Sequence, residues 1–387
     1  MKPGRRSGGY WPGPEHELLL RAAVLDAAET AEAWQSLRSR VEPDTLDRAS
    51  LRLLPLLGAN LRRHGIDDGL ARRLAELRRP VALQNQVLFD GGSTVLRALA
   101  GAGLDTLVLK GGALATSHYR DIGLRPMHDL DVLVATADAP AAIEVLRRTG
   151  WASPSRITPA FISTQHAAHL SGHGAARCDL HWHVYWECCQ PDDDDDLWAS
   201  SVALDFGGVP TRMLGPADQL LHVLVHGSRR TQYPVLVWVP DAILTMRAGG
   251  IDWDRLVAQA ARRRFVLRTL TALEYLGEAL DAPVPASVLA RLRSLPVSPL
   301  ERLEYAVINR PQGLLGELPS YWCNYLRSRE RRRVPSPLAF LRYMQHTWHA
   351  ESLAGAARGA LIRARIRVHE GLKRVSAAPR SRDAQRP

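Results

Sequence analysis

Residues 108–134, "VLKGGALATSHYRDIGLRPMHDLDVLV", contain two short apolar runs that are typical of buried strands. A glycine pair, a helix-like stretch and a basic loop lie between them. Asp129 and Asp131 stand where the second run begins and alternate with Leu130. Because alternate side chains of a strand point to the same face, both carboxylates should project to one side. Two like charges there require either that one carboxylate is protonated or that a cation lies between them.

The sequence around this stretch predicts an α/β (α+β) core with a small mixed sheet, flanked by N-terminal and C-terminal helical regions. Strands and helices alternate in the core. They are expected as a strand at 104–110, a helix opened by "GGALATSHY", a strand at 129–135, a helix at 138–150 capped by Asp138, and a strand at 176–186. A strand and turn follow in "DFGGVPTRML". Outside the core, apolar residues recur at spacings of three and four, as in amphipathic helices.

These patterns divide the chain into five parts. They are a flexible N-terminus (1–14), a helical region (15–103), the α/β core (104–215), a second helical region (216–326) and a basic, partly helical or disordered tail (327–387). Pro43, Pro55 and Pro80 are expected as helix breaks or first-turn residues.

The composition is that of a globular protein, with 46% hydrophobic residues in 387. No run reaches the roughly 18 to 20 apolar residues that a membrane span requires. The basic start "MKPGRRSGGYWPGPEHE" is followed by no apolar stretch of the kind found in secretion signals, so we expect a cytoplasmic protein. The four cysteines form no CxxC pair, which favours reduced, structural thiols.

The net charge of +10 is concentrated at the C-terminal end. From residue 327 onward the chain has 15 Lys or Arg against 4 Asp or Glu, so the preceding part is close to neutral. This tail could contact nucleic-acid phosphates or an anionic membrane surface. The alternative is a solvated and partly disordered end.

The central stretch carries residues suited to nucleotide chemistry. Gly111 and Gly112, at a strand-to-helix junction, would let backbone N–H groups approach a triphosphate. Asp129 and Asp131 offer the hard oxygen ligands that Mg²⁺ prefers. Two-metal phosphoryl transfer usually needs a third carboxylate, and Asp179 in "CDLHWHV" lies on the next predicted strand, where pairing could bring it close.

The strand, Gly-Gly, helix, DxD, strand, Asp arrangement resembles the nucleotidyltransferase superfamily of DNA polymerase β type. "LKGGALA…YRDIGLRPMHDLDVLV" with "CDLHWHV" is similar to its uncharacterised bacterial nucleotidyltransferase branch. The resemblance continues through "LLHVLVHGSRR", "WVPDAIL" and "IDWDRL", and it covers roughly residues 15 to 300.

This resemblance implies a role for each core residue. Gly111 and Gly112 match the glycine signature, Asp129 and Asp131 the metal-binding pair, and Asp179 the third carboxylate, nearest the nucleophile. The 16 residues between Gly112 and Asp129 exceed the superfamily's common spacing. A longer loop over the nucleotide is the expected consequence.

Two basic residues are further candidates for nucleotide binding. Lys110 is one of only three lysines beside 47 arginines, and it could contact a phosphate as a compact charge or simply lie at the surface. Arg125 could bind the γ-phosphate in a bidentate manner. Its alternative is a structural salt bridge with Asp121.

Several histidines invite a different metal interpretation. His181 and His183 share the strand parity of Asp179, so the three could bind Zn²⁺ or Mn²⁺. Along an extended strand they span roughly 13 Å, too far for one ion, and His181 is better placed as an active-site neighbour. His222 and His226 have the i, i+4 spacing of some zinc sites, but their apolar setting favours core or interdomain histidines.

Two further residues, His128 and Asp241, and the run of aspartates at 192–196 have mainly structural explanations. His128 is expected in a loop. Asp241, in "WVPDAIL", is either a buried cap or salt-bridge partner or a substrate contact. The aspartates at 192–196 look like a metal site, but consecutive residues converge poorly on one ion, so a solvated loop is expected.

The sequence therefore predicts a magnesium- or manganese-dependent nucleotidyltransferase that transfers a nucleoside monophosphate from an NTP, with ATP expected, to an unidentified acceptor and releases pyrophosphate. The acceptor is left open among a small molecule, a peptide, a saccharide and RNA. Three alternatives stand beside this hypothesis: a catalytically silent nucleotide-binding or scaffold protein, a toxin-like enzyme that modifies tRNA, and a histidine-centred metal hydrolase.

Overall fold

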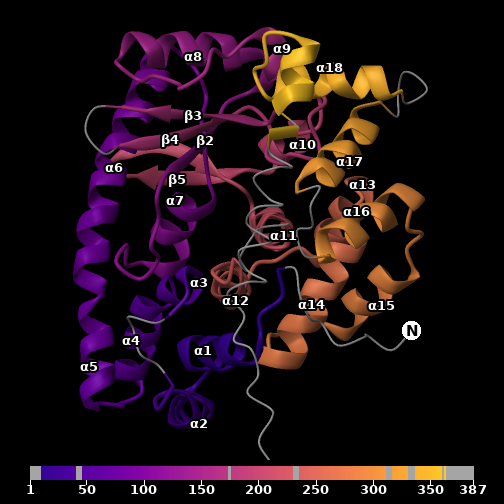
Figure 1. Cartoon of the computed structure of the whole chain (residues 1–387). Coiled ribbons are helices and arrows are strands. Elements are labelled where there is room, and N and C mark those ends of the chain that lie inside the picture. Colours follow the sequence, from indigo (N-terminus) through magenta and orange to yellow (C-terminus); the bar gives the residue numbers. More distant parts are fainter. Residues whose placement is uncertain are drawn as a thin grey trace, which may run out of the picture.

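The computed structural model describes residues 10–40, 46–172, 176–229, 235–310, 316–329, 336–359 and 361–362. A six-stranded sheet lies between two groups of helices (Figure 1). Its strands are β1 (Leu107–Leu109), β2 (Leu130–Leu133), β3 (Ala167–Ser171), β4 (Arg177–His181), β5 (Val202–Phe206) and β6 (Val209–Met213). The strand order is β3-β4-β2-β1-β6-β5.

The sheet is mixed, which confirms the predicted α/β core. β1 pairs with β2 antiparallel and with β6 parallel, and β2 pairs with β4 parallel. β3 was not expected from the sequence. It is a short strand that pairs with β4, forms one isolated bridge from Ser171 to Ala152, and exposes alternate residues, so its apolar pattern is weak.

Helices precede, interrupt and follow the sheet. The N-terminal helices are α1 (Pro14–Val24), α2 (Ala27–Leu37), α3 (Arg48–Leu51), α4 (Leu54–Arg63), α5 (Gly69–Glu76) and α6 (Arg78–Gly101). Between the strands lie α7 (Lys110–Leu114), the π-helix η2 (Ala115–Tyr119), the 3₁₀ turn η3 (Thr136–Asp138), α8 (Ala139–Arg148), α9 (Pro159–Ile162) and α10 (Asp195–Ala199). After the sheet come α11 (Pro216–Gly227), α12 (Trp238–Ala248), α13 (Trp253–Arg262), α14 (Val266–Leu280), α15 (Ala286–Ser294), α16 (Pro299–Asn309), α17 (Leu318–Arg329) and α18 (Pro337–Thr347).

Most of the predicted helix boundaries have a local physical cause. Pro55 and Pro80 lie in the first turns of α4 and α6, as expected, whereas Pro43 falls outside the described residues. Gly249 ends α12 with a φ of +78°, which only glycine adopts without strain. Asp138 occupies the N-cap position of α8, but its side chain makes no capping hydrogen bond.

Each face of the sheet packs in a different hydrophobic core. Val108, Val132 and Leu180 face α6 and α8. Leu109 and Leu133, one residue out of phase, face the second core, which holds α11 and α12. Functional side chains with the parity of Leu109 and Leu133 therefore point toward the C-terminal helices.

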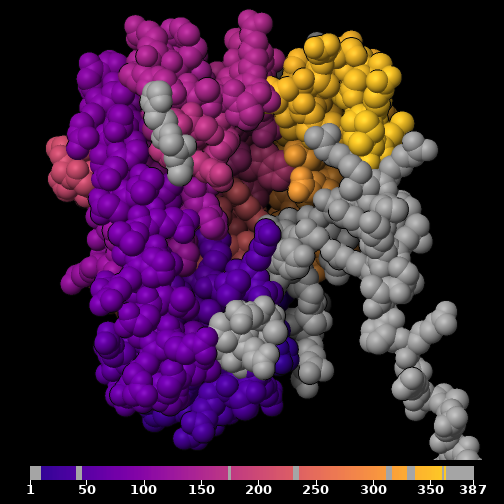
Figure 2. All heavy atoms as spheres, turned by 60° about the vertical axis from the view of Figure 1, so that its left-hand side comes forward, coloured from indigo at the N-terminus to yellow at the C-terminus, as the bar shows by residue number. Residues whose placement is uncertain are grey.

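The second core is shared by the N-terminal and the C-terminal helices. It contains apolar residues of α1, α2 and α4 together with those of α11 to α15. Tyr10 and Trp11, which lie in the segment expected to be flexible, are buried in it. Figure 2 shows the N-terminal helices in indigo at the base of the molecule and the last helices in yellow beside the sheet region.

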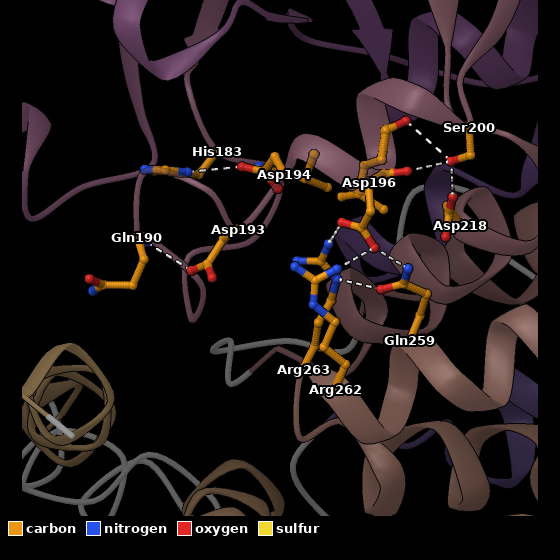
Figure 3. A network of polar contacts seen from close by, with 12 residues as sticks. His183, Gln190, Asp193, Asp194, Asp196, Ser200, Asp218, Gln259, Arg262 and Arg263 are labelled. Carbon is orange, nitrogen blue, oxygen red and sulfur yellow. Dashed lines mark hydrogen bonds and ion pairs between the residues drawn. The ribbon is translucent and has the colours of Figure 1, made fainter. Parts of the chain in front are cut away.

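The acidic run at 192–196 is only in part the solvated loop that the sequence predicts, because Asp192 and Asp195 are exposed but Asp194 and Asp196 are held by partners within the protein. Asp194 is buried and accepts a hydrogen bond from His183 Nδ1 at 2.9 Å. Asp196, at the start of α10, pairs with Arg263, the C-cap residue of α13, at 2.8 Å (Figure 3). Asp194 and Asp196 bind different partners rather than surround one ion, and Asp196 connects α10 to the end of α13.

The start of the basic tail is anchored in the same way. Arg327 forms a nearly buried ion pair with Glu304 of α16 at 2.5 Å. The second basic run, at 361–374, lies almost entirely outside the described residues, so its predicted contact with nucleic acid or membrane remains a prediction. Within the described ranges, no helix combines the length and the apolar character needed to cross a membrane.

The four cysteines are free thiols, as expected. Burial raises the pKa of Cys188 and of Cys323 to about 12, so both are protonated at neutral pH. The buried thiols contribute to the packing of the protein interior.

Candidate functional site

The candidate site lies on the central strand β2. Asp131 has Leu109 of β1 as its neighbour on one side and Asp179 of β4 on the other. His181 follows Asp179 by two residues, so both side chains project to the face that Asp131 occupies. Ligand atoms of Asp131, Asp179 and His181 all lie within 4.8 Å of one another. We call these three residues the donor cluster.

Asp131 is held ionised by two neighbours. Lys110 Nζ forms an ion pair with its Oδ1, and His181 Nε2 lies 3.0 Å from the same oxygen. Burial acts to raise the pKa of Asp131, but the charge of Lys110 and the contact with His181 outweigh it and lower the pKa below its ordinary range. Since both contacts fall on Oδ1, Oδ2 is the oxygen left for another cation.

Asp129 has the opposite electrostatic environment. It precedes β2 and is only half-buried. Burial raises its pKa to about 6, with further contributions from the negative charges of Asp131 and Asp179. The structure therefore meets both of the conditions that the sequence offered as alternatives. A cation, Lys110, lies against one carboxylate, and the other binds a proton more readily than usual.

Two further histidines near β4 contact different aspartates: His169 contacts Asp179, and His183 contacts Asp194. Asp179 accepts a hydrogen bond from His169 of β3, at 2.8 Å from Nδ1. β4 ends at His181, so the strand parity does not extend to His183, which instead contacts Asp194. The hypothesis of a zinc site built from Asp179, His181 and His183 is therefore wrong.

The two glycines at the end of β1 face different surroundings. Gly111 lines the candidate cavity, and a Cβ at this position would overlap Arg125 Nη1. Gly112 lies against the sheet, where a Cβ would overlap Leu130. Gly112 is therefore required for close packing of α7 on β2. Lys110, just before them, has a φ of +47°, an unfavourable value for a non-glycine residue that directs α7 away from β1.

Arg125 is already paired within the protein. Its Nε and Nη2 donate to the two carboxylate oxygens of Asp241 at 2.8 and 2.7 Å. Tyr119, at the end of the π-helix, donates to the same carboxylate at 2.8 Å. Asp121, the partner proposed from the sequence, pairs with Arg78 instead. Asp241 is thus a buried salt-bridge partner, as one of its two interpretations predicts, and it also lines the cavity.

The long loop before β2 is fixed to α6 by a residue that the sequence did not single out. Buried Asn85 donates from Nδ2 to the carbonyl oxygens of Ile122 and Arg125 and accepts a hydrogen bond from the Met127 backbone N–H. Gly123 packs directly against the backbone of α6. These contacts set the position of the loop, and hence of Asp129, relative to the sheet.

The site opens into a cavity of about 310 Å³, which we call the site cavity. It lies between the sheet, α3 and the helices α11 and α12, and it exposes Asp129 and the carboxylates of the donor cluster. Two arginines, Arg52 and Arg229, line it without forming an ion pair to any of the described residues. Arg52 Nη2 donates to the Pro126 carbonyl at 3.1 Å, while its Nε is buried without a partner in the described part of the chain.

The histidines of α11 also face this cavity. His222 and His226 have their ring centroids 6.0 Å apart, and both line its wall. Burial lowers the pKa of each well below its usual value, so both are neutral. The cluster of metal-type ligands among the described residues does not include them, so their role as cavity-lining histidines fits the structure better than a zinc pair.

Two solved structures are similar to parts of this chain. One solved structure similar to this chain is an antigenic nucleotidyltransferase-like protein from Paracoccidioides brasiliensis, at 17% identity and a TM-score of 0.34 over 58% of this chain and 95% of that chain. Another is a tRNA-processing enzyme, at 13% identity and a TM-score of 0.22 over 72% and 73% of the two chains. Both TM-scores are below 0.5, so neither likeness bears on the function of this chain.

A search of the curated proteins finds no match. A family model described as "Uncharacterised nucleotidyltransferase" matches residues 48–281, which include α3, the whole sheet and α11 to α14. This match covers more than half of the chain, and the protein therefore belongs to that uncharacterised nucleotidyltransferase family.

Proposed function

We propose that this protein is a metal-dependent nucleotidyltransferase of DNA polymerase β type. It would transfer a nucleoside monophosphate from an NTP, with ATP as the expected nucleotide, to an acceptor and release pyrophosphate. The observation that carries the proposal is the parallel register of Asp131 with Asp179, which brings two carboxylates from distant parts of the sequence to one cavity. The family assignment supports the same reaction class.

The residues present fit a divalent cation. Asp131 and Asp179 offer carboxylate oxygens, and the raised pKa of Asp129 indicates negative charge that a cation would relieve. We propose Asp129, Asp131 and Asp179 as the residues that would hold Mg²⁺ or Mn²⁺. When bound, such an ion would neutralise charge on the triphosphate and lower the pKa of the acceptor group.

The protein's own residues would bind and orient the reactants. Lys110 and Arg125 line the cavity, and each already forms an ion pair, with Asp131 and Asp241 respectively. We propose that the two basic residues hold these carboxylates in position. Their charges would also contribute a positive potential at the phosphates. Arg52 and Arg229, which have no carboxylate partner among the described residues, are better placed to bind phosphate oxygens directly. The backbone of Gly111 is a further proposed phosphate contact.

The chemical step needs a base beside the acceptor. We propose that Asp179 takes the proton of the acceptor group. The oxygen of that acceptor group forms a bond to the α-phosphorus at the same time. The bond from the α-phosphorus to the bridging oxygen of the β-phosphate then breaks, and pyrophosphate leaves with the electron pair. His169, hydrogen bonded to Asp179, would keep that carboxylate oriented.

The test is transfer of label from each α-³²P-labelled NTP to material in a cell extract with MgCl₂ present. We expect labelled product from one NTP, no product from γ-³²P-labelled NTP, and no product with Asp129→Ala or Asp131→Ala. Asp138→Ala is the matched control, because Asp138 does not line the site cavity and its side chain makes no capping bond. Product that persists in both site variants would contradict the mechanism. Binding of MgATP without any transfer would favour the catalytically silent alternative.

A further inference from the structure

A second cavity, of about 330 Å³, adjoins the site cavity on the side of the C-terminal helices. We call it the adjoining cavity. Trp186, which follows β4, lines it together with Ile308 of α16 and Tyr321 of α17. Arg229 lines both cavities, so they meet at its side chain.

A second residue links the adjoining cavity to the donor cluster. His166 lines this cavity, and its ring centroid lies 5.2 Å from that of His181. Burial and the nearby charges lower the pKa of His166 well below its usual value, so the ring is neutral. Its Nδ1 is buried and finds no hydrogen-bond partner in the described part of the chain. A buried polar atom without a partner is costly, so a water or a ligand group that reached Nδ1 would gain a hydrogen bond there.

The walls of the adjoining cavity combine aromatic and aliphatic side chains, among them Trp186, Tyr321 and Ile308, with polar and charged ones. The rings of Trp186 and Tyr321 lie 5.2 Å apart and nearly perpendicular, at 87°. Five charged side chains line the cavity: Glu187, Arg229, Arg268, Glu304 and Glu317. Glu187 and Arg268 neutralise each other in an ion pair of 2.5 Å, and Glu304 pairs with Arg327. A volume near the lower end of the roughly 300–1,000 Å³ typical of small-molecule sites is too small for a folded polymer segment.

We propose that the adjoining cavity is the acceptor site and that the acceptor is a small hydroxyl-bearing molecule with an aromatic or otherwise flat apolar body. This inference rests on the proposed nucleotidyl transfer. The apolar body packs against Trp186 and Tyr321, where aromatic stacking stabilises it. The hydroxyl passes His166 and reaches Asp179. Its oxygen then attacks the α-phosphorus, Asp179 takes its proton, and pyrophosphate leaves.

The experiment fills the adjoining cavity with a larger side chain and leaves unchanged the residues proposed to bind the nucleotide. Ser320 of α17 lines the cavity and is half-buried, so Ser320→Trp should occupy the space of the acceptor. The matched control is Ser294→Trp on the exposed surface of α15. Each protein is incubated with α-³²P-labelled ATP, MgCl₂ and the low-molecular-mass or the macromolecular fraction of a cell extract. MgATP binding is measured separately by calorimetry.

We expect the parent protein to label a product in the low-molecular-mass fraction. Ser320→Trp should lose about tenfold or more of this labelling while it binds MgATP like the parent, and Ser294→Trp should match the parent in both assays. Tyr321→Ala, which removes a wall instead of filling the space, should raise the amount of extract needed for half-maximal labelling. This second variant keeps the test valid if the larger substitution prevents folding.

Three outcomes would overturn the inference. Equal labelling by the parent, Ser320→Trp and Tyr321→Ala would place the acceptor elsewhere and leave nucleotidyl transfer intact. Label found only in macromolecules would refute a small acceptor, and again leave the transfer itself supported. A parent that binds no MgATP and labels nothing would refute the proposed function, and the acceptor assignment with it.

Discussion

Replacement of Asp241 by asparagine should destabilise the protein strongly. The Asp241 carboxylate accepts two hydrogen bonds from Arg125 and one from Tyr119, and the side chains of Arg125 and Asp241 are only 9% and 5% exposed. Asparagine has the same shape, but it removes the negative charge and turns an NH₂ group toward an N–H or O–H donor. The guanidinium would then be buried without a counter-ion.

The magnitude follows from the burial of this pair. Breaking a buried ion pair by removing one partner costs about 3–5 kcal/mol. Arg125 also lines the site cavity, where water can solvate part of its charge, so we expect the lower end, about 3 kcal/mol. Burial acts to lower the pKa of Arg125, but Asp241 outweighs it and raises the pKa. The pair should therefore contribute stability throughout the neutral pH range.

Urea unfolding followed by circular dichroism at neutral pH measures this effect. Asp138→Asn is the matched control, and it should leave the midpoint unchanged because that side chain is partly exposed and makes no capping bond. In a double-mutant cycle, Arg125→Met with Asp241→Asn should cost clearly less than the sum of the single changes. A loss below about 0.5 kcal/mol for Asp241→Asn, the range of ordinary surface substitutions, would refute the reasoning.

Other predictions concern the site and its support. Asp131→Asn should reduce nucleotidyl transfer by about 10²-fold or more, measured with α-³²P-labelled ATP, because a proposed ligand is lost; transfer within a few-fold of the parent would count against that role. Gly112→Ala should cost about 1–3 kcal/mol in urea unfolding, since its Cβ would overlap Leu130. Asn85→Ala should cost about 1–3 kcal/mol by the same measurement and speed proteolysis in the loop before β2, because three hydrogen bonds are lost. The pKa of Asp129 is raised to about 6, so its negative charge destabilises the folded protein above that pH when no metal is added. This destabilisation disappears as the pH falls toward 4. Mn²⁺ affinity, measured by calorimetry, should therefore fall as the pH drops through about 6, and Asp129→Asn should flatten that dependence.

The sequence by itself determined the elements of the core and much of the candidate site. Two apolar runs with a glycine pair and alternating aspartates predict strand, helix and strand, because side-chain alternation and backbone sterics act within a few residues. The same alternation places Asp179 and His181 on one face of β4. Such local rules required no knowledge of distant contacts.

Only the tertiary structure decided which charges meet across the fold. Arg125 finds Asp241, 116 residues away in the sequence, rather than nearby Asp121. Asp194 and Asp196 lie buried or paired although their sequence context is that of a solvated loop. Strand pairing also ends at His181, which turns His183 away from the site.

The physical reason is that an ion pair depends on the distance between side chains, and this distance is set by the packing of whole helices on the sheet. Arg229 carries no sequence signal beyond a basic residue at the end of a helix. It lines the two cavities only because α11 covers the face of the sheet to which Asp131 points. Local sequence thus specifies the donors of the site, and long-range packing specifies their partners and the space in which a substrate could bind.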